Sequence, residues 1–223
     1  MMPHTKIAYL GLFDSDKATG SPRGERHLLA LARSVVAGSA GNVRVELLSC
    51  GPAAECRPLC PGVVKRVLRW AGRPRTPWDA SSWELPAALA DASLVHLHDG
   101  FSRECEIGLL VAKQQRTPVC ISEYGLIGHW LSIELGLHAL ADMVICHSAS
   151  VAAPWRGVAP VEVVSGHVNP YWFGVASEWP RTIPVPPADR ADESPPDVDY
   201  VTLGAQLSAI YRRLLARQQE AAA

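Results

Sequence analysis

Residues 92–123 read ASLVHLHDGFSRECEIGLLVAKQQRTPVCISE, and this stretch decides the fold. Residues 92–98 form an apolar run typical of a buried strand, and residues 119–122 form a second run of this kind after a Thr-Pro pair. Between these runs, residues 104–115 carry apolar side chains at helical spacing. A strand, a helix and a strand in this order predict two parallel strands joined by a right-handed crossover.

The same alternation extends to both sides of this stretch. Further strands are predicted at residues 6–12, 43–49, 143–147 and 161–164, and further helices at residues 26–37, 83–90, 130–141 and 148–155. Strands that alternate with helices pair into a mostly parallel sheet that is covered on both faces. The sequence therefore predicts an α/β fold with a doubly wound, Rossmann-like sheet.

Composition divides the chain into three segments. Residues 1–175 form the predicted Rossmann-like domain, with an insertion at about residues 51–82 in which residues 63–70 are predicted to form a short helix. Residues 176–201 are rich in prolines and acidic residues, which is typical of an extended linker. Residues 202–223 form an amphipathic helix that needs a surface to pack on, so we expect it to dock on the domain. Its apolar stripe consists of Leu203, Leu207, Ile210, Tyr211, Leu214 and Leu215.

Charge and apolar content argue against several classes of protein. The formal net charge of -1 gives no general attraction to nucleic acid or to an anionic membrane, so no nucleic-acid partner is expected. No transmembrane run and no signal peptide are recognised, so we expect a cytoplasmic protein. The six cysteines are expected to be buried free thiols. A zinc site at Cys50, Cys56 and Cys60 is the weaker alternative, because no CxxC pair occurs.

Candidate site residues follow the predicted strands, because ligands of a doubly wound sheet bind outside the carboxyl ends of its strands. The loop after the first strand contains Gly11, Gly20 and Gly24 together with Arg23, just before a helix. Glycines allow close approach of the backbone, and a helix N-terminus offers free N–H groups to an anion. The spacing matches neither GxGxxG nor a P-loop, so a phosphate cradle and a plain flexible loop both stay open.

His96 and His98 lie two residues apart on a predicted strand, so their side chains point to the same face. Such a pair can bind a metal in a hydrolase, but no further ligand cluster of suitable spacing occurs, and no metal is expected. The preferred interpretation places His96 in the packed sheet and His98, with Asp99, at the mouth of the strand.

Glu123 and Tyr124 leave the next predicted strand at the same edge of the sheet. The carboxylate could act as a base and the phenol as a hydrogen-bond donor. A strand-end turn with a solvated Glu123 is the alternative. Ser148 is expected to cap the helix that follows the strand at residues 143–147.

The order of these pieces resembles the family-4 glycosyltransferases of the GT-B fold. The helix motif G-G-x-E-R-x-x-x-x-L-A of that family is similar to residues 24–33, and its D-x-V-H-x-H strand is similar to Asp91 and residues 94–98. Its P-V-V-x-T-x-H-G, A-D-x-V-x-x-x-S and V-x-x-G-V-D-x-x-x-F segments resemble residues 118–125, 141–148 and 164–173. The resemblance covers roughly residues 6–173.

This resemblance implies retaining transfer of a sugar from a nucleotide-sugar donor to an acceptor hydroxyl, with a sugar or glycan acceptor as partner and no cofactor. It implies His98, Glu123 and Tyr124 as the catalytic group. The substrate-binding group that it implies consists of Gly11, Gly20, Arg23, Gly24, Asp99 and Ser148.

The chain also departs from the family pattern. Tyr124 stands where the family often has a histidine, and Asn169 stands where it has an aspartate. The donor-binding domain, with its GR-x-x-x-KG and E-x7-E segments, is missing, and residues 207–215 resemble the final helix of the family. We therefore expect this chain alone to be a weak or inactive transferase.

Two other functions stay open at this point. One is a non-catalytic binding or assembly subunit that pairs, with itself or with a separate donor-domain chain, through the face left by the missing domain. The other is a small metal-dependent hydrolase that uses His96 and His98.

Overall fold

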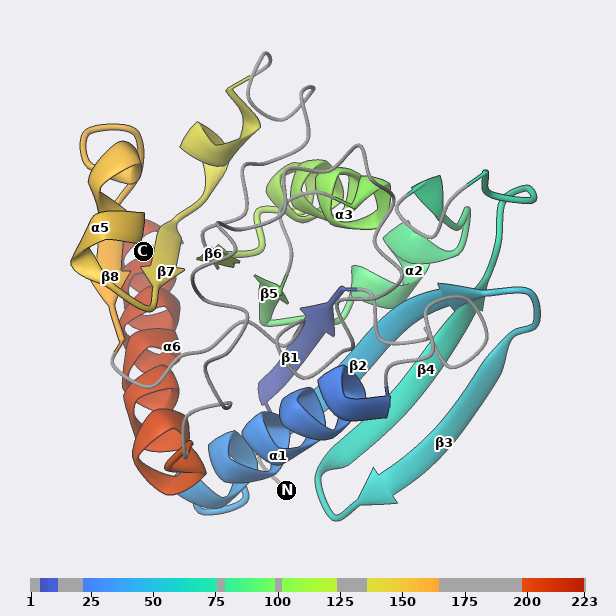
Figure 1. Ribbon diagram of the computed structural model, residues 1–223, viewed down its shortest axis with the longest axis horizontal. Helices are drawn as coiled ribbons and strands as arrows, with labels where there is room; N and C mark the ends of the chain where they lie inside the picture. The colour runs from blue at the N-terminus through green and yellow to red at the C-terminus, as the bar shows by residue number, and fades with distance from the viewer. Residues whose placement is uncertain are drawn as a thin grey trace, which may run out of the picture.

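The computed structural model describes residues 5–11, 22–75, 79–98, 102–123, 136–164 and 198–222. In these ranges, eight strands form one sheet in the order β3-β4-β2-β1-β5-β6-β7-β8 (Figure 1). The strands are β1 (Thr5–Leu10), β2 (Val43–Gly51), β3 (Glu55–Cys60), β4 (Val63–Arg69), β5 (Leu94–Leu97), β6 (Val119–Glu123), β7 (Met143–Cys146) and β8 (Val161–Val163).

All neighbouring strands pair in parallel except β3 and β4, which form an antiparallel hairpin. Along the parallel strands, the order β4-β2-β1-β5-β6-β7 is the 3-2-1-4-5-6 order of a doubly wound sheet, and β8 adds one more parallel strand at the edge. The strand order reverses between β1 and β5. Ligands of doubly wound sheets bind at this point. Here β1 and β5 pair directly, with Ile7 opposite Leu94 and Leu10 opposite Leu97.

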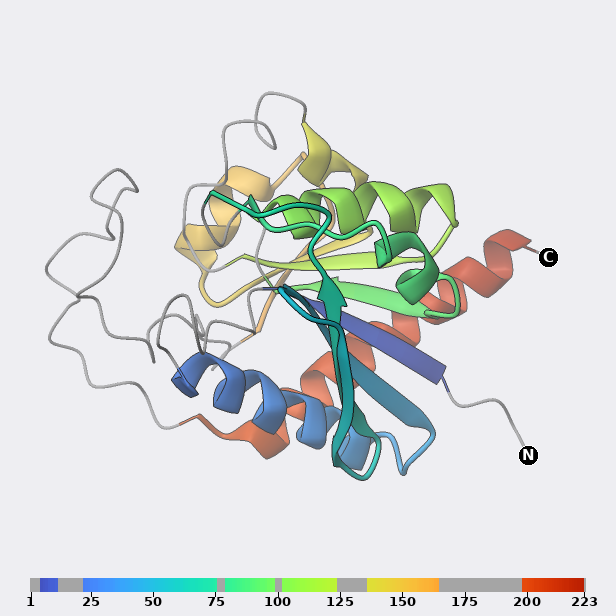
Figure 2. The ribbon, with the colours of Figure 1, turned by 90° about the vertical axis from the view of Figure 1, so that its right-hand side faces the viewer.

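Helices cover both faces of the sheet, as Figures 1 and 2 show. One face carries α2 (Leu85–Leu89), α3 (Arg103–Gln114), η2 (Leu137–Leu140), α5 (Ala149–Ala152) and η3 (Ala153–Trp155). The other face carries α1 (Pro22–Gly38) and α6 (Tyr200–Ala222). Each layer buries its own apolar core against the sheet. The structure thus confirms the α/β, doubly wound, Rossmann-like fold that the sequence predicts.

The C-terminal helix α6 docks on the domain, as its apolar stripe predicts. Leu203, Leu207, Ile210, Tyr211 and Leu214 of this stripe are buried, and Leu215 packs against the same core. The helix starts beside α1, where a Cβ on Gly204 would lie 2.5 Å from the Cβ of Ser34, so the two backbones approach closely. Further along, Arg213 pairs with Glu162 of β8, with 2.5 Å between Nη2 and Oε2. Helix α6 therefore crosses this face from α1 to the far edge of the sheet.

The prediction of a helix at residues 63–70 is wrong, because these residues form the strand β4. Val63, Val64, Val67 and Leu68 fit the spacing of a helix as well as that of a buried strand, so periodicity alone cannot decide between them. Parallel pairing with β2 and antiparallel pairing with β3 decide for the strand. β-Branched side chains suit this position, because they pack well on a pleated surface.

Two other predicted segments lie largely outside the described residues. Of the helix predicted at residues 130–141, the structure describes only the part from residue 136, where η2 is a 3-10 helix. Of the linker predicted at residues 176–201, it describes only the last four residues, and two of these already belong to α6. The domain boundaries stay a prediction.

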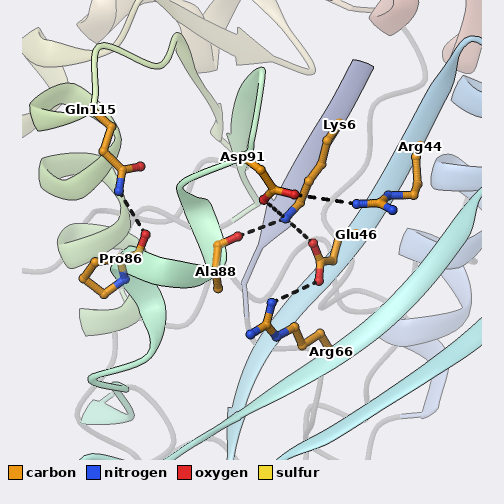
Figure 3. A network of polar contacts seen from close by, with 8 residues as sticks. All are labelled: Lys6, Arg44, Glu46, Arg66, Pro86, Ala88, Asp91 and Gln115. Carbon is orange, nitrogen blue, oxygen red and sulfur yellow. Dashed lines mark hydrogen bonds and ion pairs between the residues drawn. The ribbon is translucent and has the colours of Figure 1, made fainter. Parts of the chain in front are cut away.

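A buried ion-pair network ties the amino end of β1 to its neighbours (Figure 3). The ammonium of Lys6, only 4% exposed, pairs with Glu46 of β2 and with Asp91, and donates to the carbonyl of Ala88 at 3.0 Å. Glu46 is nearly as buried as Lys6, and its second cation is Arg66 at 3.8 Å. The network holds α2 and the approach to β5 against β1 and β2. It lies at the edge of the sheet opposite the carboxyl ends of the strands.

Candidate functional site

The candidate site lies at the carboxyl ends of β1 and β5, where the strand order reverses. Gly11 directly follows β1 and is buried, and the amide of His98 donates to the carbonyl of Leu10 at 2.8 Å, so the two strand ends stay together. Helix α3 begins just beyond, where the hydroxyl of Ser102 accepts from the amide of Cys105 at 3.3 Å. This capping bond is typical of a helix start. The start of α3 is therefore fixed beside the point where a ligand of a doubly wound sheet would bind.

Three rings pack together behind this edge. His96 and His98 have ring centroids 3.9 Å apart, which confirms that both side chains point to one face. Tyr9 of β1 packs on both, with centroid distances of 5.2 Å to His96 and 4.4 Å to His98. His98 is only 1% exposed in the described structure. Its ring is therefore part of the packed interior at the end of β5.

His96 takes part in a buried hydrogen-bond chain that reaches α6. Its Nε2 lies 2.6 Å from the hydroxyl of Ser122, and its Nδ1 lies 2.5 Å from the hydroxyl of Tyr211. The hydroxyl of Tyr211 lies 2.9 Å from that of Tyr9. Burial lowers the pKa of His96 to about 3, so the ring is neutral at physiological pH. His96 is thus a packed residue of the sheet, which confirms the preferred interpretation of the sequence.

Among the described residues, no group of three or more His, Cys, Asp or Glu side chains is arranged to hold a metal ion. The hydroxyls of Ser122 and Tyr211 already occupy both ring nitrogens of His96. A metal-binding role for the His96 and His98 pair would require breaking one of these bonds.

Glu123 ends β6, the strand next to β5. Its side chain is only 2% exposed, so the alternative of a solvated glutamate in a surface turn is wrong. Burial, together with the charge of Glu123, raises the pKa of Cys146 on β7 to about 12. The carboxylate therefore lies inside the carboxyl edge of the sheet, close to β7. Along this edge, Gly11, His98 and Glu123 follow one another at the ends of the neighbouring strands β1, β5 and β6.

Ser148 caps α5, as predicted. Its hydroxyl accepts from the amide of Val151 at 3.3 Å and lies 2.9 Å from the hydroxyl of Ser150. The residue follows β7, two strands away from β5. Its structural role as a cap is explained by these contacts, and its predicted role in substrate binding stays a prediction.

Five of the predicted site residues are described in part or not at all. Gly20, Asp99 and Tyr124 lie outside the described residues. Arg23 and Gly24 lie in the first turn of α1, where only the backbone is described. The proposed roles of these five residues stay predictions.

The sequence patterns alone do not single out Glu104. It lies in the first turn of α3, only 1% exposed, and hydrogen-bonds Cys50 near the end of β2. Burial, reinforced by the charge of Glu104, raises the pKa of the Cys50 thiol far above its usual range, so Cys50 is a neutral thiol. The signal in the sequence was an acidic residue in the first turn of the helix that follows the switch-point strand.

The six cysteines are all free. Cys50, Cys105, Cys120 and Cys146 are buried, and Cys60 is partly buried. The expectation of buried thiols is wrong for Cys56, which is exposed on the edge strand β3.

Stability should fall as the solution is acidified from pH 6.5 to pH 5. Burial lowers the pKa of His27 to about 4 and that of His96 to about 3, below the usual value near 6.5. In this window the unfolded chain binds more protons than the folded one, so the free energy of unfolding rises with pH and is lost on acidification. Each of these histidines contributes a slope of up to about 1.4 kcal/mol per pH unit. Urea unfolding at several pH values measures the total slope.

The variants His27→Gln and His96→Gln separate the two contributions. Each substitution should reduce the slope of the free energy of unfolding against pH by the contribution of the histidine that it removes. An unchanged slope in either variant would show that the ring replaced in it does not titrate on unfolding.

These features define a doubly wound α/β protein whose candidate site lies at the carboxyl edge between β1 and β6. No protein-family model matches the chain, and no curated protein matches it. A crystal structure described as that of a UDP-N-acetylglucosamine 2-epimerase from Listeria monocytogenes is similar, with a TM-score of 0.47 and 11% sequence identity. The match covers 70% of this chain and 42% of that one, so this chain spans less than half the length of that protein.

None of the helices in the described part of the chain is long and apolar enough to cross a membrane.

Proposed function

We propose that this chain is the acceptor-side half of a glycosyltransferase-type protein and holds a sugar or glycan acceptor at the carboxyl edge of its sheet. The observation that supports this most is the strand order, because the reversal between β1 and β5 brings Gly11, His98 and Glu123 to one edge. The resemblance of residues 6–173 to family-4 glycosyltransferases supports the same assignment. The doubly wound fold alone does not define a function, because proteins of this fold have many different activities.

In this proposal each residue has a distinct task at the edge. The buried carboxylate of Glu123 accepts a hydrogen bond, and in the transfer step the proton, of the acceptor hydroxyl. The buried rings of His98 and Tyr9 pack against each other and support this edge from behind. The amides at the start of α1 carry the partial positive charge of a helix N-terminus, which favours the phosphates of a donor.

The length of the chain between β8 and α6 bears on its activity. Only the 33 residues from 165 to 197 separate Val164 from Val198. A second nucleotide-binding domain of the usual size needs on the order of 100 residues. No donor-binding domain of that kind therefore lies between the sheet and α6 in this chain, and sugar transfer would need a donor domain from another source.

We expect the purified 223-residue chain to bind a glycan and to turn over UDP- or GDP-sugars little or not at all. Calorimetry with a panel of glycans and nucleotide sugars, together with a nucleotide-release assay, measures both properties. The variant Glu123→Gln keeps the shape of the side chain and should weaken glycan binding, whereas Glu55→Gln on the edge strand β3 should not. Robust turnover by the chain alone would contradict the expectation of a weak or inactive transferase.

The short segment between β8 and α6 also favours a second candidate, a binding or assembly subunit without catalytic activity. Such a subunit would pair with a separate chain that supplies a donor domain. Co-purification with that chain, and transferase activity that appears only on mixing, would support it. Glycan binding by a strictly monomeric chain that no partner activates would count against it.

A further inference from the structure

The segment that joins β4 to α2 has an unusual surface. Its described residues, 70–75 and 79–84, follow Arg69, and they include Trp70, Trp83, Arg73 and Arg75. The side chain of Trp83 is 85% exposed, although tryptophan is usually buried to a large extent. An exposed tryptophan that packs on nothing in the protein is a feature of binding surfaces.

This segment lies at the same edge of the sheet as the candidate site. The amide of Trp70 donates to the carbonyl of Gly51, at the end of β2, at 2.8 Å. The carboxylate of Asp79 faces the guanidinium of Arg103, in the first turn of α3, with 3.9 Å between Oδ1 and Nη2. Figure 2 shows the residues after β4 running to the end of the molecule where α3 begins. The segment thus borders the switch point between β1 and β5.

The segment is also positively charged. Arg69, Arg73 and Arg75 are exposed, and none of them forms an ion pair with any residue that the structure describes. Of the two acidic residues between positions 69 and 84, Asp79 already faces Arg103. Three exposed guanidinium groups and an exposed indole therefore lie on the same segment and remain available to a ligand at this edge.

We propose that Trp83, Arg73 and Arg75 form a binding surface for an anionic glycan, so that the acceptor of this protein carries carboxylate groups. The flat face of an indole packs on the C–H face of a pyranose ring, and the planar guanidinium fork matches a carboxylate with two parallel hydrogen bonds. The proposal rests on the function proposed above and narrows its acceptor. A single-stranded nucleic acid offers similar groups, and the resemblance of residues 6–173 to sugar-transferring proteins favours the glycan.

Calorimetry of the full chain with a galacturonic acid oligomer and with its methyl ester tests this proposal. The two oligomers share the same rings, and only the acid is charged. We expect the acid to bind about tenfold or more tightly than the ester, with affinity that falls as salt is added. The double variant Arg73→Gln/Arg75→Gln should reduce that preference about tenfold, and Trp83→Ala should weaken binding of both oligomers about fivefold.

Matched variants elsewhere serve as controls. Arg217→Gln and Val201→Ala change an exposed arginine and an exposed apolar residue on α6, and should leave binding unchanged. Because Trp83, Arg73 and Arg75 are exposed, their variants should keep the thermal unfolding temperature of the parent.

The outcomes separate this proposal from the proposed function. The proposal of a surface for anionic glycans would be overturned if the acid and the ester bound equally, or if the variants at positions 73, 75 and 83 bound as the parent does. Either result would leave the proposed glycan-binding function intact. Absence of binding to every glycan tested would overturn both. Tight binding of an oligothymidine, lost in Trp83→Ala, would overturn the glycan assignment in favour of a nucleic acid.

Discussion

The substitution Lys6→Met is expected to lower the free energy of unfolding by about 3–5 kcal/mol, because it leaves a buried carboxylate without its main cation. Lys6 and Glu46 have side chains that are 5% and 8% exposed, and no described cation other than Lys6 and Arg66 pairs with Glu46 (Figure 3). Arg66 stands 3.8 Å away and cannot replace the direct contact. Urea unfolding of the variant and the parent at neutral pH measures the loss.

Two further variants show whether the loss comes from the unpaired charge. In Lys6→Met/Glu46→Leu both charges are gone, and apolar replacements of buried ion pairs are often neutral or stabilising, so most of the loss should be recovered. The control Lys113→Met breaks an ion pair with Asp142 that is about one-third exposed, and should cost no more than about 1 kcal/mol. Equal losses for Lys6→Met and Lys113→Met would contradict the role assigned to the buried pair.

Helix α6 is expected to be an integral part of the fold, so Leu207→Ala should lower the free energy of unfolding by about 2–5 kcal/mol. Leu207 is fully buried in the core between α6, α1 and the sheet. The close approach at Gly204 and Ser34 prevents α6 from moving inward to fill the space left by the smaller side chain. The cavity should therefore persist, which places the loss at the upper end for such a change.

The exposed residue Val201 on the same helix provides the control. Val201→Ala changes a side chain that is 79% exposed and should shift stability by less than about 0.5 kcal/mol. If Leu207→Ala is as mild as Val201→Ala, then α6 does not contribute to the stability of the domain. If the far-UV helical signal were lost at a lower temperature than the signal of the folded core, this would also show that α6 does not contribute to the stability of the domain.

The sequence predicts most of the fold because its local patterns agree with the tertiary structure. The apolar runs of β1, β2 and β5 to β7 are short and largely buried, as the strands of a covered sheet are, and the apolar stripe of α6 needs a partner surface. The strand β4 could not be predicted from residues 63–69 alone, since their spacing fits a helix as well. Its identity depends on pairing with β2 and β3, which are known only from the folded structure.

The candidate site was predicted less completely than the fold. The rule that ligands bind at carboxyl ends of strands located Gly11, His98 and Glu123 at one edge. The chain from Tyr9 through Tyr211 to His96 joins residues up to 202 positions apart, and no local pattern encodes such a contact. The burial of Glu123 and the contact of Glu104 with Cys50 likewise depend on residues far apart in the sequence.

Hydrogen–deuterium exchange of the 223-residue chain, recorded with and without a saturating glycan ligand, tests the central claim most directly. We expect protection in the peptides that contain the carboxyl ends of β1, β5 and β6 and the start of α3. The amino ends of the same strands, around Lys6, should exchange unchanged. Protection confined to the Lys6 edge, or no protection with any glycan, would contradict a sugar site at the switch point of this sheet.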